Sequence, residues 1–196
     1  MAIERHPYGE FIPKQATGMI IGSFPIGKFT DPNRRHEINA HEFDFFFGGQ
    51  KNLLWKLISQ AVDTKINSKA DVIKMLTDLK LGVGDVIKSC SRKNGGASDS
   101  DLLQISFNLE LIDVIKAHKI KTLYFTSKKV EHWFNRLFPN TSELKKVSLI
   151  SPSAQTLRSL GANERYQKCK EKYPHRKGID FIYAEYRKVF SRINRE

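Results

Sequence analysis

Short apolar runs alternate along the chain with segments whose apolar residues recur every three or four positions. A short run closed by Gly, Pro or Ser is typical of a buried strand, whereas the longer spacing is typical of an amphipathic helix. The runs predict strands over Gly18 to Phe24, Val83 to Ile87, Lys121 to Thr126 and Lys146 to Ile150. The helical spacing predicts helices over Asn52 to Val62, Ala70 to Leu79, Asp101 to His118, Val130 to Phe138 and Tyr183 to Ile193.

The order of these elements determines the expected fold. Strands that alternate with helices form a mostly parallel sheet with helices on both faces, because each crossover helix packs back onto the sheet. No linker, internal repeat or low-complexity tract divides the 196 residues. We therefore expect one α/β domain over residues 1–196, a three-layer α/β/α sandwich around a mostly parallel central sheet.

Function is expected in the loops that follow the strands, because ligands of open α/β sheets bind beyond the carboxyl ends of the strands. Three such loops, 22–27, 89–101 and 151–153, are small and polar. Small residues let the backbone approach a ligand closely, and backbone N–H groups can hold an anionic oxygen or a base edge. Each loop alone is better explained as a plain turn, but their shared place at one rim of the sheet favours a site.

A cluster of aromatic residues lies just before a flexible Gly-Gly pair: Phe43, Phe45, Phe46 and Phe47. Aromatic rings can stack on nucleobases, but they are more often buried in a core. We therefore expect at least two of these rings to belong to the core, and one exposed ring would suffice to bind a base.

The chain carries a large excess of positive charge, with 33 Lys and Arg against 21 Asp and Glu, a net charge of +12 and a pI near 9.7. Nucleic acid is the first candidate partner of such a chain, although many soluble proteins are basic for other reasons. Arg92 and Lys93 lie in the 89–101 loop and are candidates for phosphate contact, with a solvated surface loop as the alternative. For the basic run 165–177 we favour the solvated surface.

Several other classes of function have no support in the sequence. Cys90, Cys169 and the six scattered histidines lack metal-ligand spacing, so no metal site is expected, and surface or packing positions explain the histidines better. Phosphate-binding, dinucleotide-binding and nucleophile motifs are absent. No run approaches the roughly 18 apolar residues of a membrane span, and the N-terminal segment has no apolar signal-peptide core. We expect a cytoplasmic protein.

Four stretches, taken together, resemble the uracil-DNA glycosylase superfamily, and most closely its hypoxanthine and mismatch-specific branches. They read IIGSFPIG (20–27), FFFGGQKNLLWKLI (45–58), GVGDVIKSCSRKNGGASDSDL (82–102) and LISPSA (149–154). The resemblance implies a three-layer α/β fold, a monomer without cofactor, and hydrolysis of the N-glycosidic bond of a deaminated base, hypoxanthine or uracil, in DNA. The second and third stretches are the specific ones, because family register is kept at Asn52, Trp55, Asp85, Ser89, Cys90, Arg92, Ser98, Asp99 and Ser100.

The resemblance also implies roles for individual residues. It places the catalytic asparagine at Asn52, for which the alternative is a residue that caps the start of a helix. It places the ring that stacks on the flipped base at Phe47. The other residues expected at the base are Gly22, Ser23, Phe24, Thr126 and Ser151; those expected to contact DNA are Lys51, Ser89, Arg92, Lys93, Ser98 and Ser153, with Gln155 or Leu157 as the wedge that fills the place of the flipped nucleotide.

Three positions depart from the family pattern. Phe24 stands where the mismatch-specific branch has its catalytic asparagine, Thr126 stands where the hypoxanthine branch has an amide, and Ser151 replaces a histidine or asparagine. Beside the leading hypothesis, a monofunctional DNA glycosylase, these departures leave open a non-catalytic nucleic-acid-binding protein on the same fold. A small-molecule hydrolase or nucleoside-processing enzyme is a third possibility, against which the net charge argues.

Overall fold

The computed structural model describes residues 2–93, 96 and 98–193, and the strands of this part of the chain form two sheets. The larger sheet has four strands in the order β3-β2-β6-β7, and every neighbouring pair is parallel. This arrangement confirms the predicted parallel sheet. Its strands are β2 (Gly18–Gly22), β3 (Leu81–Asp85), β6 (Thr122–Phe125) and β7 (Lys145–Ser148).

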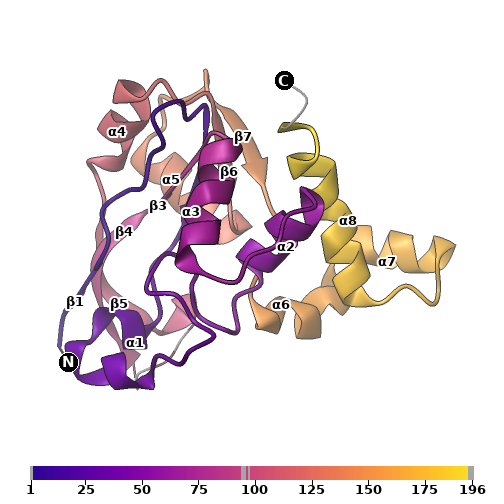
Figure 1. Cartoon of the computed structure of the whole chain (residues 1–196), viewed down its shortest axis with the longest axis horizontal. Coiled ribbons are helices and arrows are strands. Elements are labelled where there is room, and N and C mark those ends of the chain that lie inside the picture. The colour runs from indigo at the N-terminus through magenta and orange to yellow at the C-terminus, as the bar shows by residue number, and fades with distance from the viewer. Residues whose placement is uncertain (1, 94–95, 97, 194–196) are drawn as a thin grey trace.

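Helices cover both faces of this sheet (Figure 1), which confirms the three-layer α/β/α prediction. Successive residues of a strand point to opposite faces. Ile20 of β2 therefore packs into one core with Leu57 and Tyr186, whereas its neighbours Met19 and Ile21 pack into the other. The first core includes α2 (Leu54–Ala61), α3 (Lys69–Asp78) and α8 (Gly178–Phe190); the second includes α4 (Leu111–Ala117) and α5 (Lys128–Leu137).

Side-chain caps fix where two of these helices begin. The Ser68 hydroxyl accepts a hydrogen bond from the Asp71 backbone N–H at 3.2 Å and so caps α3. Ser127 caps α5 in the same way, accepting from Val130 N–H at 3.2 Å. Such caps stabilise a helix because they bond N–H groups that have no partner within the helix.

The smaller sheet contradicts one prediction. It is antiparallel, in the order β1-β4-β5, with β1 at Glu4–Arg5, β4 at Ile87–Arg92 and β5 at Leu102–Phe107. The single helix predicted over 101–118 was wrong, because its first part is β5 and only its second part is α4. Periodicity along one segment does not report a hydrogen-bond partner elsewhere in the chain, and here β4 supplies that partner. The start of the predicted 89–101 loop likewise belongs to β4, and residues 94, 95 and 97 of that loop lie outside the described residues.

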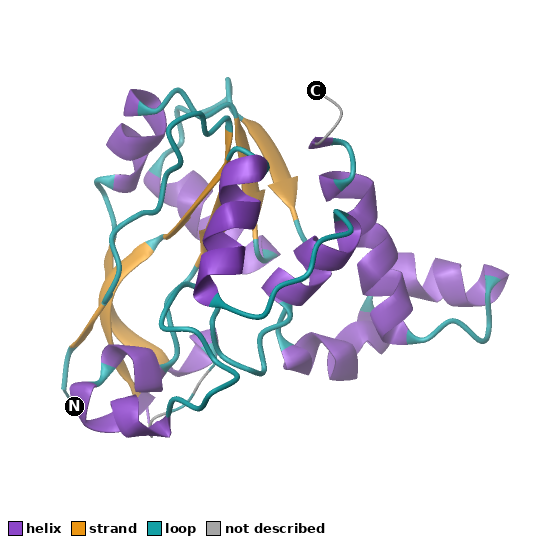
Figure 2. Ribbon diagram, in the orientation of Figure 1, coloured by secondary structure: helices purple, strands orange, loops and turns teal. Residues whose placement is uncertain are grey.

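Short helices that the periodicity did not predict fill the connections (Figure 2). One group follows β7 and leads to α8, which begins before the predicted start at Tyr183. In this group α7 buries no side chain, in agreement with a solvated surface for the basic run 165–177. The short helices are α1 (Gly27–Thr30), η1 (Pro32–Glu37), η3 (Asp99–Asp101), α6 (Ala154–Ser159), η4 (Leu160–Ala162) and α7 (Glu164–Lys172).

Candidate active site

A cavity of about 650 Å³ lies at the carboxyl ends of the parallel strands. Its walls come from the loops after β2, β6 and β7, from η3, and from the segment that leads into α2. The structure therefore brings together most of the residues predicted from sequence to form the site. Those that line the cavity are Ser23, Phe24, Phe47, Lys51, Asn52, Ser98, Thr126, Ser151, Ser153 and Gln155.

Gly22, at the end of β2, lies beneath a ring and a carboxylate. A Cβ atom placed on Gly22 would come closer than 3.0 Å to Asp85 Oδ1 and to the tip of the Phe47 ring, so only glycine fits. The Phe47 ring packs edge to face against the Trp55 ring, with the two ring centres 5.9 Å apart. The Phe47 backbone adopts a positive φ of 53°. Phe45 and Phe46 are buried in the core, which confirms the expectation that at least two of the clustered rings are core residues.

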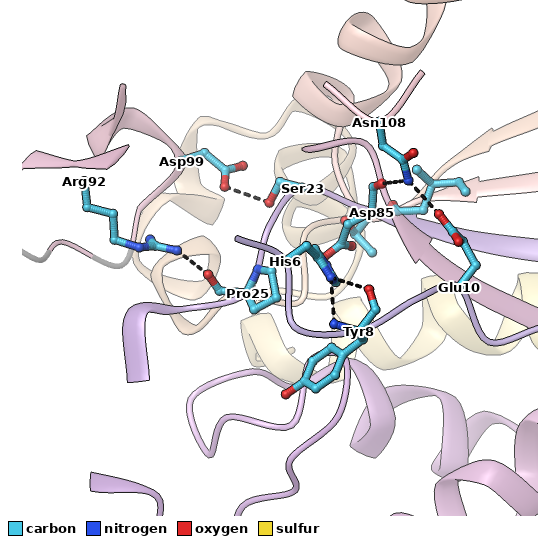
Figure 3. Close-up of polar contacts among 11 residues, drawn as sticks. His6, Tyr8, Glu10, Ser23, Pro25, Asp85, Arg92, Asp99 and Asn108 are labelled. Carbon is cyan, nitrogen blue, oxygen red and sulfur yellow. Dashed lines mark hydrogen bonds and ion pairs between the residues drawn. The ribbon is translucent and has the colours of Figure 1, made fainter. Parts of the chain in front are cut away.

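Asp85 and His6 form a buried pair at the cavity (Figure 3). Asp85 Oδ2 accepts a hydrogen bond from His6 Nε2 at 2.9 Å, and His6 Nδ1 lies 2.8 Å from the Tyr8 carbonyl oxygen. Burial lowers the pKa of His6, but the hydrogen bond and charge of Asp85 outweigh burial, so the pKa is raised above 6.5. The Tyr8 backbone N–H also lies 3.2 Å from His6 Nδ1. Asp85 Oδ1, by contrast, is buried and has no hydrogen-bond partner within the described residues.

A second carboxylate, Asp99, lines the same cavity. The Ser23 hydroxyl donates to Asp99 Oδ1 at 2.7 Å, which ties η3 to the loop after β2. Burial raises the pKa of Asp99, and the nearby charge of Asp85 raises it as well, against the lowering effects of Ser23 and Lys129. The Ser23 hydroxyl hydrogen is therefore already used inside the site.

Asn52 lines the cavity, as expected for a catalytic residue, and its side chain also bonds a backbone N–H at the start of a helix, which was the alternative role. Its Oδ1 accepts a hydrogen bond from Leu54 N–H at 2.9 Å, within the first turn of α2. Its backbone forms an isolated antiparallel bridge with Ser153, and the neighbouring Leu53 N–H donates to the Pro152 carbonyl at 2.9 Å. Two loops more than ninety residues apart in sequence are thus joined by their main chains.

The remaining polar residues of the cavity wall are partly engaged with the protein. The Thr126 hydroxyl is buried and donates to the Ile21 carbonyl oxygen at 3.2 Å, so its hydrogen is already bonded to the main chain and not to a base. Ser151 Oγ accepts from the Ser153 backbone N–H at 3.4 Å, and Ser153 Oγ accepts from Gln155 N–H at 3.3 Å as the cap of α6. Ser151 and Ser153 retain hydroxyl hydrogens that can donate to a ligand.

Four of the residues predicted to contact DNA do not line the cavity. Arg92 is buried: it pairs with Glu4 at 2.9 Å, donates to the carbonyl oxygens of Gly96 and Pro25, and lies over the Phe24 ring. The expected phosphate contact of Arg92 is therefore wrong. Its N–H donors bond Glu4 and two main-chain carbonyl oxygens inside the protein, so Arg92 has a structural role. The other three are Ser89 within β4, Lys93 on the surface, and the exposed Leu157 on α6.

Several polar side chains of the site were not predicted from the sequence. His6 was expected at the surface or in packing, and Asp85 and Asp99 were noted only for their register. Nothing in the local sequence indicates that His6 contacts Asp85. Arg158, exposed on α6, also lines the cavity.

The described residues contain no group of three His, Cys, Asp or Glu side chains placed to hold a metal ion. Within the same residues, no helix is long and apolar enough to cross a membrane.

Comparison with known proteins identifies similarity to solved structures. No protein-family model matches the chain, and no curated protein matches it. Among solved structures, the chain is similar to the solution structure of a protein from Methanosarcina acetivorans that is described as a candidate uracil DNA glycosylase. The TM-score is 0.59 at 19% sequence identity, over 98% of this chain and 99% of that one. A likeness at this level of identity establishes that the chain has the fold of that protein.

Proposed function

We propose that this protein is a DNA glycosylase of the uracil-DNA glycosylase superfamily, which hydrolyses the N-glycosidic bond of a deaminated base, hypoxanthine or uracil, flipped out of DNA. The observation that carries the proposal is the open cavity at the carboxyl ends of the parallel strands, with the Phe47 ring and the Asn52 side chain in its wall. Enzymes that act on a base extrude it into such a pocket and stack it on an aromatic ring. The fold shared with the M. acetivorans protein supports the same proposal.

The charge distribution around the cavity suits a nucleic-acid substrate. Lys51 and Arg158 are exposed and line the cavity, so they are placed to contact phosphates that flank a flipped nucleotide. Gln155 is exposed at the same wall and is the better-placed wedge, whereas Leu157 does not line the cavity. The net charge of +12 supplies a long-range attraction between the protein and DNA.

In the proposed reaction, a water molecule attacks C1′ of the nucleotide while the bond from C1′ to the base breaks. Positive charge develops on the sugar, the electron pair of the broken bond moves to the base, and the proton that the water loses passes through solvent to the released base. Asn52 would orient the water through its side-chain amide. Asp85 would place negative charge near the sugar and base. The Phe47 ring would hold the base by stacking.

The catalytic assignment is tested by comparing two asparagine variants on duplex oligonucleotides that carry hypoxanthine or uracil. Asn52→Ala should lower the excision rate by roughly 10²- to 10⁴-fold, the range for loss of a group that acts on a transferred proton or an attacking water. Asn163→Ala is the matched control, because Asn163 caps α7 through Tyr166 N–H at 3.1 Å and does not line the cavity. Excision by Asn52→Ala at the wild-type rate would refute the assignment.

A second candidate function is a nucleic-acid-binding protein without catalysis. It is favoured by Thr126, whose hydroxyl bonds the main chain, and by Phe24, whose buried ring can neither orient water nor bond a base. Binding of damaged duplexes without release of any base, across a panel of single- and double-stranded substrates, would favour this alternative over the glycosylase.

A further inference from the structure

The part of the cavity next to Gly22 is lined by groups that attract positive charge. Among the described residues, Asp85 Oδ1 is buried without a hydrogen-bond partner, and the Asp99 carboxylate, which lines the same cavity, accepts from the Ser23 hydroxyl. An ionised carboxylate can only accept hydrogen bonds. The face of the Phe47 ring is also negative, because of the quadrupole of the aromatic ring.

The cationic groups near these carboxylates do not cancel this character. His6 bonds Asp85 Oδ2 and leaves Oδ1 free, and Arg92 is paired with Glu4. Lys129 bonds the main-chain oxygen of Asp99 at 3.2 Å, not its carboxylate. The remaining cations of the cavity wall, Lys51 and Arg158, are exposed.

We propose that the base site selects a purine that presents N–H donors and carries positive charge, the class formed when a purine is alkylated on a ring nitrogen. This inference rests on the proposed N-glycosidic hydrolysis and extends it to a class of base other than deaminated bases. Uracil presents one N–H between two carbonyl oxygens, and hypoxanthine presents N1–H beside its O6 carbonyl oxygen, so each offers a single N–H donor on this edge. A 7-methylguanine in DNA presents N1–H and the amino group together, and its ring is cationic.

The chemistry by which the base is released also fits an alkylated, cationic purine. When water attacks C1′ of a 7-methylguanine nucleotide, the C1′–N9 bond breaks and its electron pair moves to N9. The ring loses its positive charge, the neutral base leaves, and the water oxygen bonds to C1′ while its proton passes to solvent. No anion forms on the base, so the site needs no group to stabilise one. The negative charge of Asp85 favours the positive charge that develops on the sugar.

The Phe47 ring, on which the base would stack, lies next to the unpaired oxygen of Asp85. The tip of the ring and Asp85 Oδ1 both lie within 3.0 Å of the position that a Cβ atom on Gly22 would occupy, so they are near neighbours. A base that stacks on the ring is therefore placed close to Oδ1. A buried acceptor without a partner is unfavourable, and a donor on the ligand removes that cost.

The test uses duplexes of one sequence that carry 7-methylguanine, hypoxanthine or uracil, with base release measured for the full-length protein and corrected for release without enzyme. We expect the wild type to excise 7-methylguanine fastest. Asp85→Asn should lower that rate by on the order of ten- to a hundredfold, the effect of losing a charge-assisted hydrogen bond. It should lower the hypoxanthine rate much less, because the amide can donate to the carbonyl oxygen.

The ratio of the two rates separates recognition from damage to the fold, since a structural defect would lower both rates alike. If Asp85→Asn does not fold, Asp99→Asn, which can still accept from Ser23, tests the same ratio. Excision of hypoxanthine or uracil without excision of 7-methylguanine would overturn the inference and leave the proposed function standing. An unchanged ratio in the carboxylate variants would also overturn the inference. Release of no base at all would overturn the proposed function itself.

Discussion

Gly22→Ala is the sharpest test of the packing at the base of the cavity. Gly22 pairs with Asp85 across β2 and β3, and a Cβ atom there would come closer than 3.0 Å to Asp85 Oδ1 and to two atoms of the Phe47 ring. Because His6 holds Asp85 in place, the Phe47 ring is the group that must move. Extra volume in a packed region costs about 1–3 kcal/mol. We therefore expect a loss of stability in this range.

Urea denaturation monitored by tryptophan fluorescence measures this change, and base excision by the same samples measures the loss of the stacking surface. Gly161→Ala is the matched control, because a Cβ atom on Gly161 in η4 meets nothing within 4 Å. A surface substitution of this kind changes stability by at most about 0.5 kcal/mol. Equal stability of Gly22→Ala and the wild type would refute the crowded geometry of Gly22, Asp85 and Phe47.

Two further predictions concern titrating groups at the cavity. Because burial raises the pKa of Asp99, the folded state disfavours its charged form, so Asp99→Asn should resist urea better than the wild type near pH 7. The gain should disappear near pH 3, where the carboxyl group is protonated in both states, and a gain that does not depend on pH would contradict this explanation. The pKa of His6 is raised, so its stabilising effect is complete below about pH 6.5 and is lost as the pH rises through its folded-state pKa. The difference in unfolding free energy between the wild type and His6→Gln should therefore shrink as the pH rises above about 6.5; a constant difference would count against the His6–Asp85 pair as its source.

The parallel sheet was predictable because strands such as Gly18–Gly22 are short apolar runs buried on both faces, and its helices are amphipathic. The antiparallel sheet was not predictable in the same way. Residues 102–107 have a spacing that also suits a helix, and the hydrogen bonds to β4 decide between the two structures. Asn108 ends the strand by donating its backbone N–H to the Val86 carbonyl at 2.8 Å, a contact that local periodicity does not report.

The candidate site divides in a similar way. Residues in the loops after the strands were found because topology alone brings those loops together, as it does for Ser23, Thr126 and Ser151. The pairing of His6 with Asp85 joins residues 79 positions apart, and neither lies in a pattern that points to the other. Arg92 was misassigned for the same reason, since a basic residue in a polar segment looks exposed until its partner Glu4 is known.

The main-chain bridge between Asn52 and Ser153 has a consequence for how this site can evolve. The bond from Leu53 N–H to the Pro152 carbonyl and the bridge itself use backbone atoms, which every residue except proline provides in full. Two walls of the binding chamber therefore keep their separation whatever side chains they carry. Substitutions at these positions can change which ligand is accepted while the frame stays intact, so specificity can diverge in this fold faster than its architecture.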